Sequence, residues 1–148
     1  MTRKPQVVGS VAAGFPSPAE QYLEPPLDLN ELLVKRPAAT FFVKVAGDSM
    51  TGAGIYDGDL LVVDRSLVPA NGDIIVAAVD GEFTVKTLRV LRNNELGIGN
   101  SVRYVLEPAN PNYPNIEIKR GNQLDCFGVV TSAIHQFKGG ASTIPHSP

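Results

Sequence analysis

The residues of this chain best suited to do chemistry are a serine and a lysine that stand far apart in the sequence. Ser49 follows Gly47 and Asp48, and Lys86 ends the run Glu82–Lys86. A serine hydroxyl is a weak nucleophile until a neighbouring base takes its proton, and lysine is that base in Ser-Lys dyads. Lysine does so only when burial lowers its pKa from about 10.4 and leaves the amine neutral near pH 7. The pair therefore predicts a serine nucleophile with a lysine general base.

Each of the two residues also has a plainer interpretation. A serine soon after a glycine is more often a turn residue than a nucleophile, because such short motifs recur by chance. The alternation along the run places Lys86 on one face with Glu82, Thr84 and Leu88, opposite Phe83 and Val85. This pattern favours a lysine exposed to solvent. A catalytic role demands the reverse, with Lys86 buried against Ser49.

The turn that carries the serine can also supply donors for developing negative charge. Gly47 lacks a Cβ, so the chain can turn sharply there and expose the backbone N–H groups of Ser49 and Met50, the expected oxyanion hole. A candidate substrate bond lies in the same chain, between Ala13 and Gly14. Alanine suits a shallow pocket, and glycine after the bond lets two backbones approach closely.

Other catalytic or metal-binding groupings are weaker. Cys126 and His135 could form a thiol–imidazole pair, but Cys126 lies in an apolar strand pattern and is predicted to be a buried thiol. With one cysteine and two histidines that lack ligand spacing, a zinc site is not expected. Asp57, Asp59 and Asp64 flank predicted strands, where carboxylates stabilise turns, so we expect neither a metal nor a cofactor.

The size and composition of the chain narrow the classes of function. Its 148 residues suffice for one domain with a core, and 43% of them are hydrophobic. A net charge of −2 leaves no basic stripe, so direct nucleic-acid binding is not expected. No apolar run reaches the roughly 18 residues of a membrane span. A single cysteine without an export signal predicts a cytoplasmic protein.

The pattern along the chain predicts a mobile arm, a folded domain and a loose tail. Residues 1–13 are polar and aperiodic, residues 14–137 are predicted to form the domain, and residues 138–148 again lack a period. Capping signatures at Ser17–Glu20 and Asp28–Glu31 predict two short helices, each ended by a following proline.

From Thr40 onward, short β-rich runs alternate with turn residues. Asp80-Gly81 is a two-residue hairpin signal of type I′, which pairs the runs on either side of it. The expected strands are residues 40–46, 59–64, 73–80, 82–91, 103–106, 116–119 and 125–137. The sequence thus predicts a mainly β, mostly antiparallel domain preceded by short helices.

Several long blocks of the sequence, in register, resemble one known family. They are Ala13–Ala19, Phe42–Met50, Asp57–Asp64 and Gly72–Lys86, followed by Asn110–Val130. These blocks are similar to the UmuD-like group of LexA-type self-cleaving proteins of the SOS response. Because they run in register over most of the chain, they are far more specific than an isolated Ser-Lys pair.

The resemblance implies a LexA/signal-peptidase-like antiparallel β-domain that forms a homodimer and cuts its own arm after meeting the RecA filament on single-stranded DNA. Residue by residue, it implies Ser49 as the nucleophile, Lys86 as the general base and Ala13-Gly14 as the cleaved bond. In the family, the shortened dimer joins a UmuC-like Y-family DNA polymerase in error-prone translesion synthesis. Ala13 is a departure from UmuD, which has cysteine before the cut, and resembles the LexA site instead.

Two alternatives remain open on the sequence. A LexA- or phage-type repressor would need a DNA-reading helix-turn-helix before the cut, which residues 1–13 cannot supply. A dimeric interaction module with an idle dyad would keep the same fold and bind partners without chemistry. Mutagenesis unaffected by Ser49→Ala would favour this second alternative.

Overall fold

The computed structural model describes residues 5, 13–14, 26–92 and 102–138. The chain divides into two compact units, Met1–Lys35 and Arg36–Pro148, and each is described by itself. Most of the predicted arm and tail, and the capping signature at Ser17–Glu20, lie outside the described residues.

In the first unit, a short helix forms where the second capping signature predicts one. Helix α1 (Leu29–Leu33) follows Asp28, whose carboxylate accepts a hydrogen bond from the backbone N–H of Asn30 at 3.0 Å. This bond satisfies one of the N–H groups that the first helical turn leaves without a partner. The predicted helix start is therefore confirmed.

The described part of the second unit is built on one antiparallel sheet, which confirms the mainly β fold. Its strands are β1 (Thr40–Lys44), β2 (Leu60–Asp64), β3 (Ile74–Val79), β4 (Glu82–Arg92), β5 (Val102–Glu107), β6 (Ile116–Ile118) and β7 (Leu124–Ile134). Two 3-10 turns, η1 (Pro37–Ala39) and η2 (Thr51–Ala53), lie before and after β1. The seven β-rich runs predicted from the sequence correspond to these strands, with differences only at their ends.

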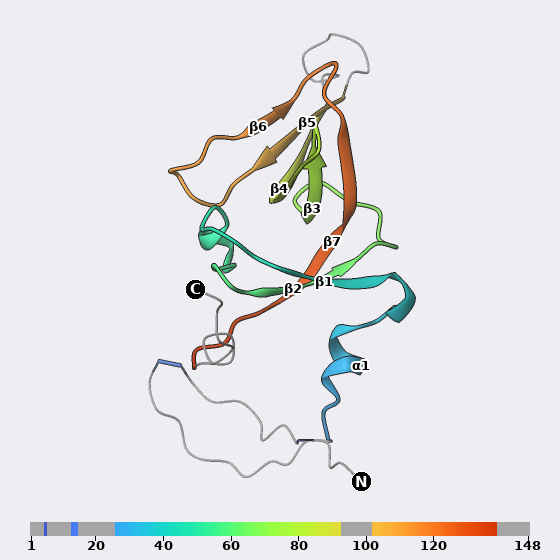
Figure 1. Cartoon of the computed structure of the whole chain (residues 1–148), viewed down its shortest axis with the longest axis vertical. Coiled ribbons are helices and arrows are strands. Elements are labelled where there is room, and N and C mark those ends of the chain that lie inside the picture. The colour runs from blue at the N-terminus through green and yellow to red at the C-terminus, as the bar shows by residue number, and fades with distance from the viewer. Residues whose placement is uncertain (1–4, 6–12, 15–25, 93–101, 139–148) are drawn as a thin grey trace. The chain divides into compact units, whose positions relative to one another are not determined.

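The spatial order of the strands is β1-β2-β7-β3-β4-β5-β6. The last strand therefore lies between strands that precede it by many residues (Figure 1). Its C-terminal half pairs with β2 and its N-terminal half with β3, and a register shift interrupts each ladder. β7 thus joins β1 and β2 to the rest of the sheet.

The β3–β4 hairpin has the turn that Asp80-Gly81 predicts. Val79 pairs with Glu82 across the two-residue connection, and the φ angles of Asp80 and Gly81 are 50° and 86°. A type I′ turn requires positive φ at both central positions, which Gly adopts freely and Asp tolerates. The turn sets the register that places Lys86 opposite Ile75.

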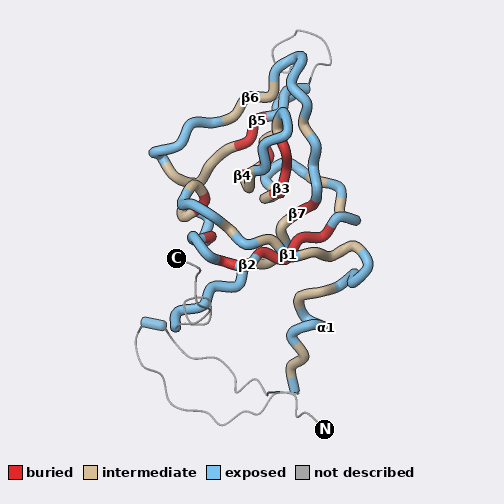
Figure 2. Tube along the Cα trace, in the orientation of Figure 1, coloured by how far each residue is buried: buried red, intermediate tan, exposed pale blue. Residues whose placement is uncertain are grey.

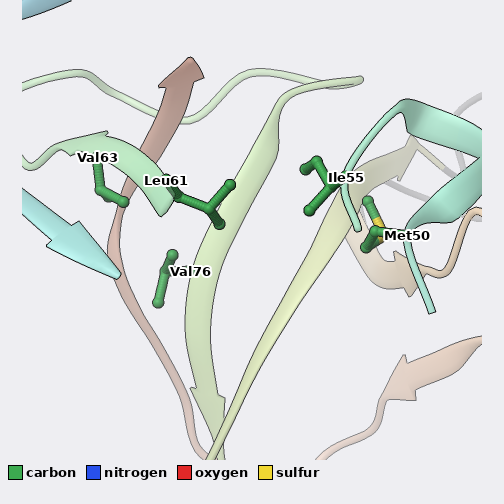
Figure 3. Packing of buried hydrophobic residues seen from close by; sticks show 5 residues of the cluster. All are labelled: Met50, Ile55, Leu61, Val63 and Val76. Carbon is green, nitrogen blue, oxygen red and sulfur yellow. The ribbon is translucent and has the colours of Figure 1, made fainter. Parts of the chain in front are cut away.

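Two groups of buried side chains form the core of this unit. Figure 2 marks in red the buried residues along the chain. The first joins the loop after β1 to β2 and β3, and consists of Met50, Ile55, Leu61, Val63 and Val76 (Figure 3). The second joins β3, β4, β5 and β7, and consists of Ile75, Ala77, Leu88, Leu106 and Val129. Because Ile75 and Val76 are consecutive in β3, the two groups lie on opposite faces of that strand.

Candidate active site

Ser49 lies in the turn after β1 and is held in place by its neighbours. Gly47 has a φ of 94°, in the left-handed region that favours glycine, and its N–H donates to the Asp57 carboxylate at 2.7 Å. Met50, directly after Ser49, is 2% exposed and belongs to the first core group. Burial of a side chain of this size contributes about 1.5–3 kcal/mol. The partly buried Ser49 is thus fixed from both sides.

Lys86 is buried in β4, with 8% of its surface exposed. Its Nζ donates hydrogen bonds to Ser49 Oγ at 2.9 Å and to Thr84 Oγ1 at 2.8 Å. A third bond, at 3.1 Å, goes to the backbone carbonyl of Val85. The interpretation of Lys86 as solvent-exposed is therefore wrong, because the Ser49 turn packs against a face of β4 that alternation alone leaves open. The structure brings together the two residues that the dyad requires.

No carboxylate of the described residues forms an ion pair with Lys86. All three of its hydrogen-bond partners are uncharged oxygens. Burial lowers the pKa of Lys86 below its ordinary value of 10.5, since desolvation penalises the charged amine. The neutral amine is the form that can accept a proton from the Ser49 hydroxyl.

The backbone N–H groups of Ser49 and Met50 are the candidates for an oxyanion hole. Neither group donates a hydrogen bond to another described residue, whereas the Gly52 N–H donates to the Ala109 carbonyl at 2.6 Å. Two adjacent N–H groups beside a nucleophile can stabilise the charge of a tetrahedral intermediate. The geometry fits the oxyanion hole expected at these two residues.

Ser49 and Lys86 open onto a cleft of about 560 Å³. Its walls are mostly apolar, with contributions from Phe41, Val43, Val45, Met50, Val76, Phe83, Val85 and Phe127. The rings of Phe83 and Phe127 lie 5.1 Å apart, and the Arg65 guanidinium lies over the Phe41 ring at 5.7 Å. Apolar and aromatic side chains therefore make up most of the surface of the cleft.

An unpaired strand edge borders the cleft. β4 pairs with β5 only from Thr87 onward, so the segment Glu82–Lys86 has a partner on one side alone in the described sheet. The register of the hairpin turns the backbone N–H and C=O groups of Phe83 and Val85 away from β3, toward the free edge. An extended peptide can add to such an edge through backbone hydrogen bonds.

The predicted substrate bond is accessible. Ala13 and Gly14 are exposed and form a bend, and no heavy atom lies within 4 Å of where a Cβ on Gly14 would be. Both residues belong to the first unit, whereas Ser49 and Lys86 belong to the second.

The weaker candidates do not form a second active site. Cys126 lies in β7 but is exposed, so the prediction of a buried thiol is wrong: a register shift between Cys126 and Gly128 breaks the alternation of the strand. His135 instead contacts the Asp59 carboxylate, with its Nδ1 at 2.5 Å. Asp57 and Asp59 accept bonds from nearby backbone N–H groups, as expected of turn carboxylates.

The part of the chain that the structure describes contains no cluster of three or more His, Cys, Asp or Glu residues that could hold a metal ion. In the same residues, no helix is long and apolar enough to cross a bilayer.

Sequence reasoning missed a third segment at the site. The Ala109 N–H donates to the Ser49 carbonyl at 2.8 Å, and the Asn110 side chain donates to the Asp48 carbonyl at 2.8 Å. The Tyr113 hydroxyl donates to the Asp48 carboxylate. The only signal for this segment in the sequence is that the family resemblance resumes at Asn110.

Comparison with known proteins finds relatives over most of the chain. The family model described as Peptidase S24-like matches residues 5–131, which include Ser49 and Lys86. Protein SamA of Salmonella typhimurium is 48% identical over 124 residues, 84% of this chain and 79% of that protein. Protein ImpA of Escherichia coli is 46% identical over 133 residues, 90% of this chain and 84% of that protein. Protein MucA of Escherichia coli is 43% identical over 125 residues, 84% of this chain and 79% of that protein.

Proposed function

The chain belongs to the Peptidase S24-like family, as a UmuD-like protein of the LexA type, and from this premise we propose that it is a self-cleaving serine peptidase of the SOS response. Its substrate is its own Ala13-Gly14 bond, with Ser49 as the nucleophile and Lys86 as the general base. The observation that carries the proposal is the 2.9 Å contact between a serine hydroxyl and a buried amine that has no counter-ion among the described residues.

The reaction proceeds through an acyl-enzyme. Neutral Lys86 takes the hydroxyl proton as Ser49 Oγ attacks the carbonyl carbon of Ala13, and the N–H groups of Ser49 and Met50 stabilise the oxyanion. When the intermediate collapses, the C–N bond breaks and Lys86 returns its proton to the amine of Gly14. Lys86 then deprotonates a water that hydrolyses the ester. The products are residues 1–13 and 14–148, and the dyad is restored.

The cleft supports a peptide substrate of this composition. The free edge of β4 at Phe83 and Val85 can pair with an extended segment. Val11 and Ala13 have small side chains that suit shallow apolar pockets, and Gly14 lets the two backbones come close.

We place the reaction in the cytoplasm, with the RecA filament as its trigger. The filament adds no catalytic side chain. It favours the conformers in which the arm of residues 1–13 lies in the cleft, which requires that it binds these conformers more tightly than the others. The cleaved homodimer, with its domain at residues 14–137 and its tail at residues 138–148, then serves as accessory subunit of a UmuC-like Y-family DNA polymerase and does not itself bind DNA.

The decisive test is incubation of the full chain with a RecA filament, followed by mass measurement of the fragments. The wild type should give fragments of residues 1–13 and 14–148, and Ser49→Ala and Lys86→Ala should stay intact. Ser132→Ala and Lys119→Ala are matched controls that should cleave normally, since neither side chain lies at the cleft. Cleavage of Ser49→Ala, or cleavage at another bond only, contradicts the proposal.

The pH dependence of cleavage without RecA gives a second test. Because only neutral Lys86 accepts the proton, the rate should rise about tenfold per pH unit below its lowered pKa and then level off. A rate that is flat between about pH 6 and pH 10 would count against Lys86 as the base.

A further inference from the structure

A loop distant in sequence holds the two peptide units around Ser49. We call the segment Ala109–Tyr113 the clamp loop. Its Asn110 side chain donates to the Asp48 carbonyl at 2.8 Å, and the Ala109 N–H donates to the Ser49 carbonyl at 2.8 Å. The Tyr113 hydroxyl donates to the Asp48 carboxylate. The clamp loop thus binds consecutive carbonyls of the nucleophile turn, and also the side chain of Asp48.

The clamp loop is itself braced. The Asn112 N–H donates to the side-chain oxygen of Asn110 at 2.9 Å, and the Tyr113 N–H donates to the Asn110 backbone carbonyl at 3.1 Å. The Ala109 carbonyl accepts from the Gly52 N–H at 2.6 Å. The side-chain oxygen of Asn110 therefore accepts a hydrogen bond within its own loop, and its side-chain nitrogen donates one to the nucleophile turn.

These contacts bear on catalysis because a peptide unit is planar. The Asp48 carbonyl belongs to the same peptide unit as the Ser49 N–H, and the Ser49 carbonyl to the same unit as the Met50 N–H. The described peptide bonds include no cis bond, and in a trans peptide the C=O and N–H point in opposite directions. Hydrogen bonds that hold the two carbonyls therefore aim the two N–H groups away from the clamp loop.

We propose that Asn110 and Tyr113 are positioning residues that act through Asp48 and the Ser49 turn to orient the oxyanion-hole N–H groups of Ser49 and Met50. This inference rests on the proposed function. Neither side chain touches the reacting atoms. The clamp matters because oriented donors stabilise the transition state only when they already point at the developing charge. A misplacement of about 1 Å at a reacting centre can cost about 10²-fold in rate.

The test is the rate of self-cleavage by the full chain at alkaline pH, with variants that remove single clamp bonds. Asn110→Ala should slow cleavage about tenfold or more, and Tyr113→Phe about threefold to tenfold, since each loosens donors worth about 10²–10³ in rate. Tyr104→Phe and Asn115→Ala, both outside the clamp loop, are matched controls. Tyr104 is 42% exposed against 41% for Tyr113, Asn115 is exposed, and neither control side chain donates a hydrogen bond to a described residue.

The pH profile separates positioning from a general loss of structure. A clamp that orients N–H groups leaves the surroundings of Lys86 intact, so Asn110→Ala and Tyr113→Phe should lower the plateau and leave the midpoint of the profile unchanged. A variant that merely loosens the site would hydrate Lys86 and move the midpoint toward 10.5, the ordinary pKa of lysine. A moved midpoint therefore contradicts the inference.

Asp48 variants complete the test. Asp48→Asn keeps an oxygen that can accept from the Tyr113 hydroxyl, so its rate should stay close to the wild type. Asp48→Ala should slow cleavage as much as Tyr113→Phe does. The double variant Asp48→Ala/Tyr113→Phe should be no slower than either single variant, because both changes remove the same Tyr113–Asp48 hydrogen bond. Wild-type rates in Asn110→Ala and Tyr113→Phe would overturn the inference alone. Continued cleavage by Ser49→Ala would instead overturn the proposed function.

Discussion

The loop between β1 and β2 carries at each end a residue of a polar pair with one buried member, Asp59 in one pair and Lys86 in the other, and the two pairs are built differently. Near its end, Asp59 is 2% exposed, and its carboxylate accepts from the Tyr56 N–H at 2.8 Å and contacts His135 Nδ1 at 2.5 Å. Near its start, Ser49 meets Lys86, which is 8% exposed and has only uncharged oxygens as partners. Both groups are thus similarly buried, but the Asp59 carboxylate has a backbone N–H and an imidazole as partners, whereas the Lys86 amine has no counter-ion in the part of the chain that the structure describes.

Under the proposed function, the difference separates a structural pair from a reactive one. A buried polar group is tolerated when hydrogen-bond partners replace its water, as the Tyr56 N–H and the His135 ring do at Asp59. Asp64 shows the same solution: the Ser66 side chain, followed by Arg36 at 2.9 Å, holds its pKa below 3.8. Lys86 has hydrogen bonds but no opposite charge among the described residues, so burial lowers its pKa and favours the neutral base. Burial without a counter-ion among the described residues is what distinguishes the Lys86 amine from these two carboxylates.

The largest effect should come from a change that keeps the positive charge of Lys86 at every pH. Arginine is not deprotonated in proteins, so Lys86→Arg should lower the self-cleavage rate by at least about 10³-fold. The measurement is the fraction of intact chain over time at alkaline pH. Lys119→Arg is the control, and substantial cleavage by Lys86→Arg would show that the amine is not the base.

The second-largest effect on cleavage should come from placing a negative charge beside Lys86, which has no counter-ion among the described residues. The Thr84 Oγ1 lies 2.8 Å from the Lys86 Nζ, so Thr84→Asp puts a carboxylate beside the amine. An opposite charge at this distance should raise the pKa of Lys86 and slow cleavage near pH 8 about 10- to 100-fold. The pH midpoint of cleavage should move upward in Thr84→Asp and stay in place in the neutral control Thr84→Asn. An unmoved midpoint in both variants would contradict the role assigned to the missing counter-ion.

The structural pair should affect stability more than cleavage. His135→Ala removes one partner of the buried Asp59 carboxylate, which should lower the free energy of unfolding by about 1–3 kcal/mol. Urea unfolding measures this, with Gln136→Ala as a control at the adjacent exposed position. The cleavage rate of folded His135→Ala should stay within about threefold of the wild type. A large loss of cleavage without loss of stability would make this pair part of the catalytic site.

The smallest effect should appear in the stability of Lys86→Met. Since the folded-state pKa of Lys86 lies below its unfolded value of 10.5, the charged amine destabilises the fold wherever both states are protonated. Methionine removes that penalty, so Lys86→Met should raise the free energy of unfolding near pH 7 by up to about 1 kcal/mol. The gain should shrink as the pH rises toward 10.5, where both states lose the proton. A destabilised Lys86→Met would mean that the Lys86 hydrogen bonds outweigh its desolvation.

Much of the fold could be predicted because its signals are local. The Asp80-Gly81 turn and the helix start at Asp28 depend on backbone preferences of a few adjacent residues, and both are confirmed. The place of β7 between β2 and β3 could not be predicted in this way. It depends on which distant strands pair, and nothing within the run of β7 specifies its partners. The register shift at Cys126 is equally non-local, and the predicted burial failed there.

The candidate site likewise has one part that the sequence predicts and one part that it does not. The residue types of Ser49 and Lys86 are evident in the sequence, and so is their resemblance to a dyad. The clamp loop is not, because Asn110 and Tyr113 carry no pattern that distinguishes a residue bonded to Asp48 from an ordinary turn residue. Their role depends on contacts across about 60 residues of chain, which local preferences do not encode.

By itself, the sequence determined the strands, the hairpin turn and the pair of residues able to act as nucleophile and base, since steric and hydrogen-bonding preferences of neighbouring residues decide these. Only the tertiary structure decided that Lys86 faces inward, because alternation along β4 pointed the other way. A lysine becomes a base when other segments exclude water from it and supply no negative charge, and that condition exists only after distant parts of the chain have packed together.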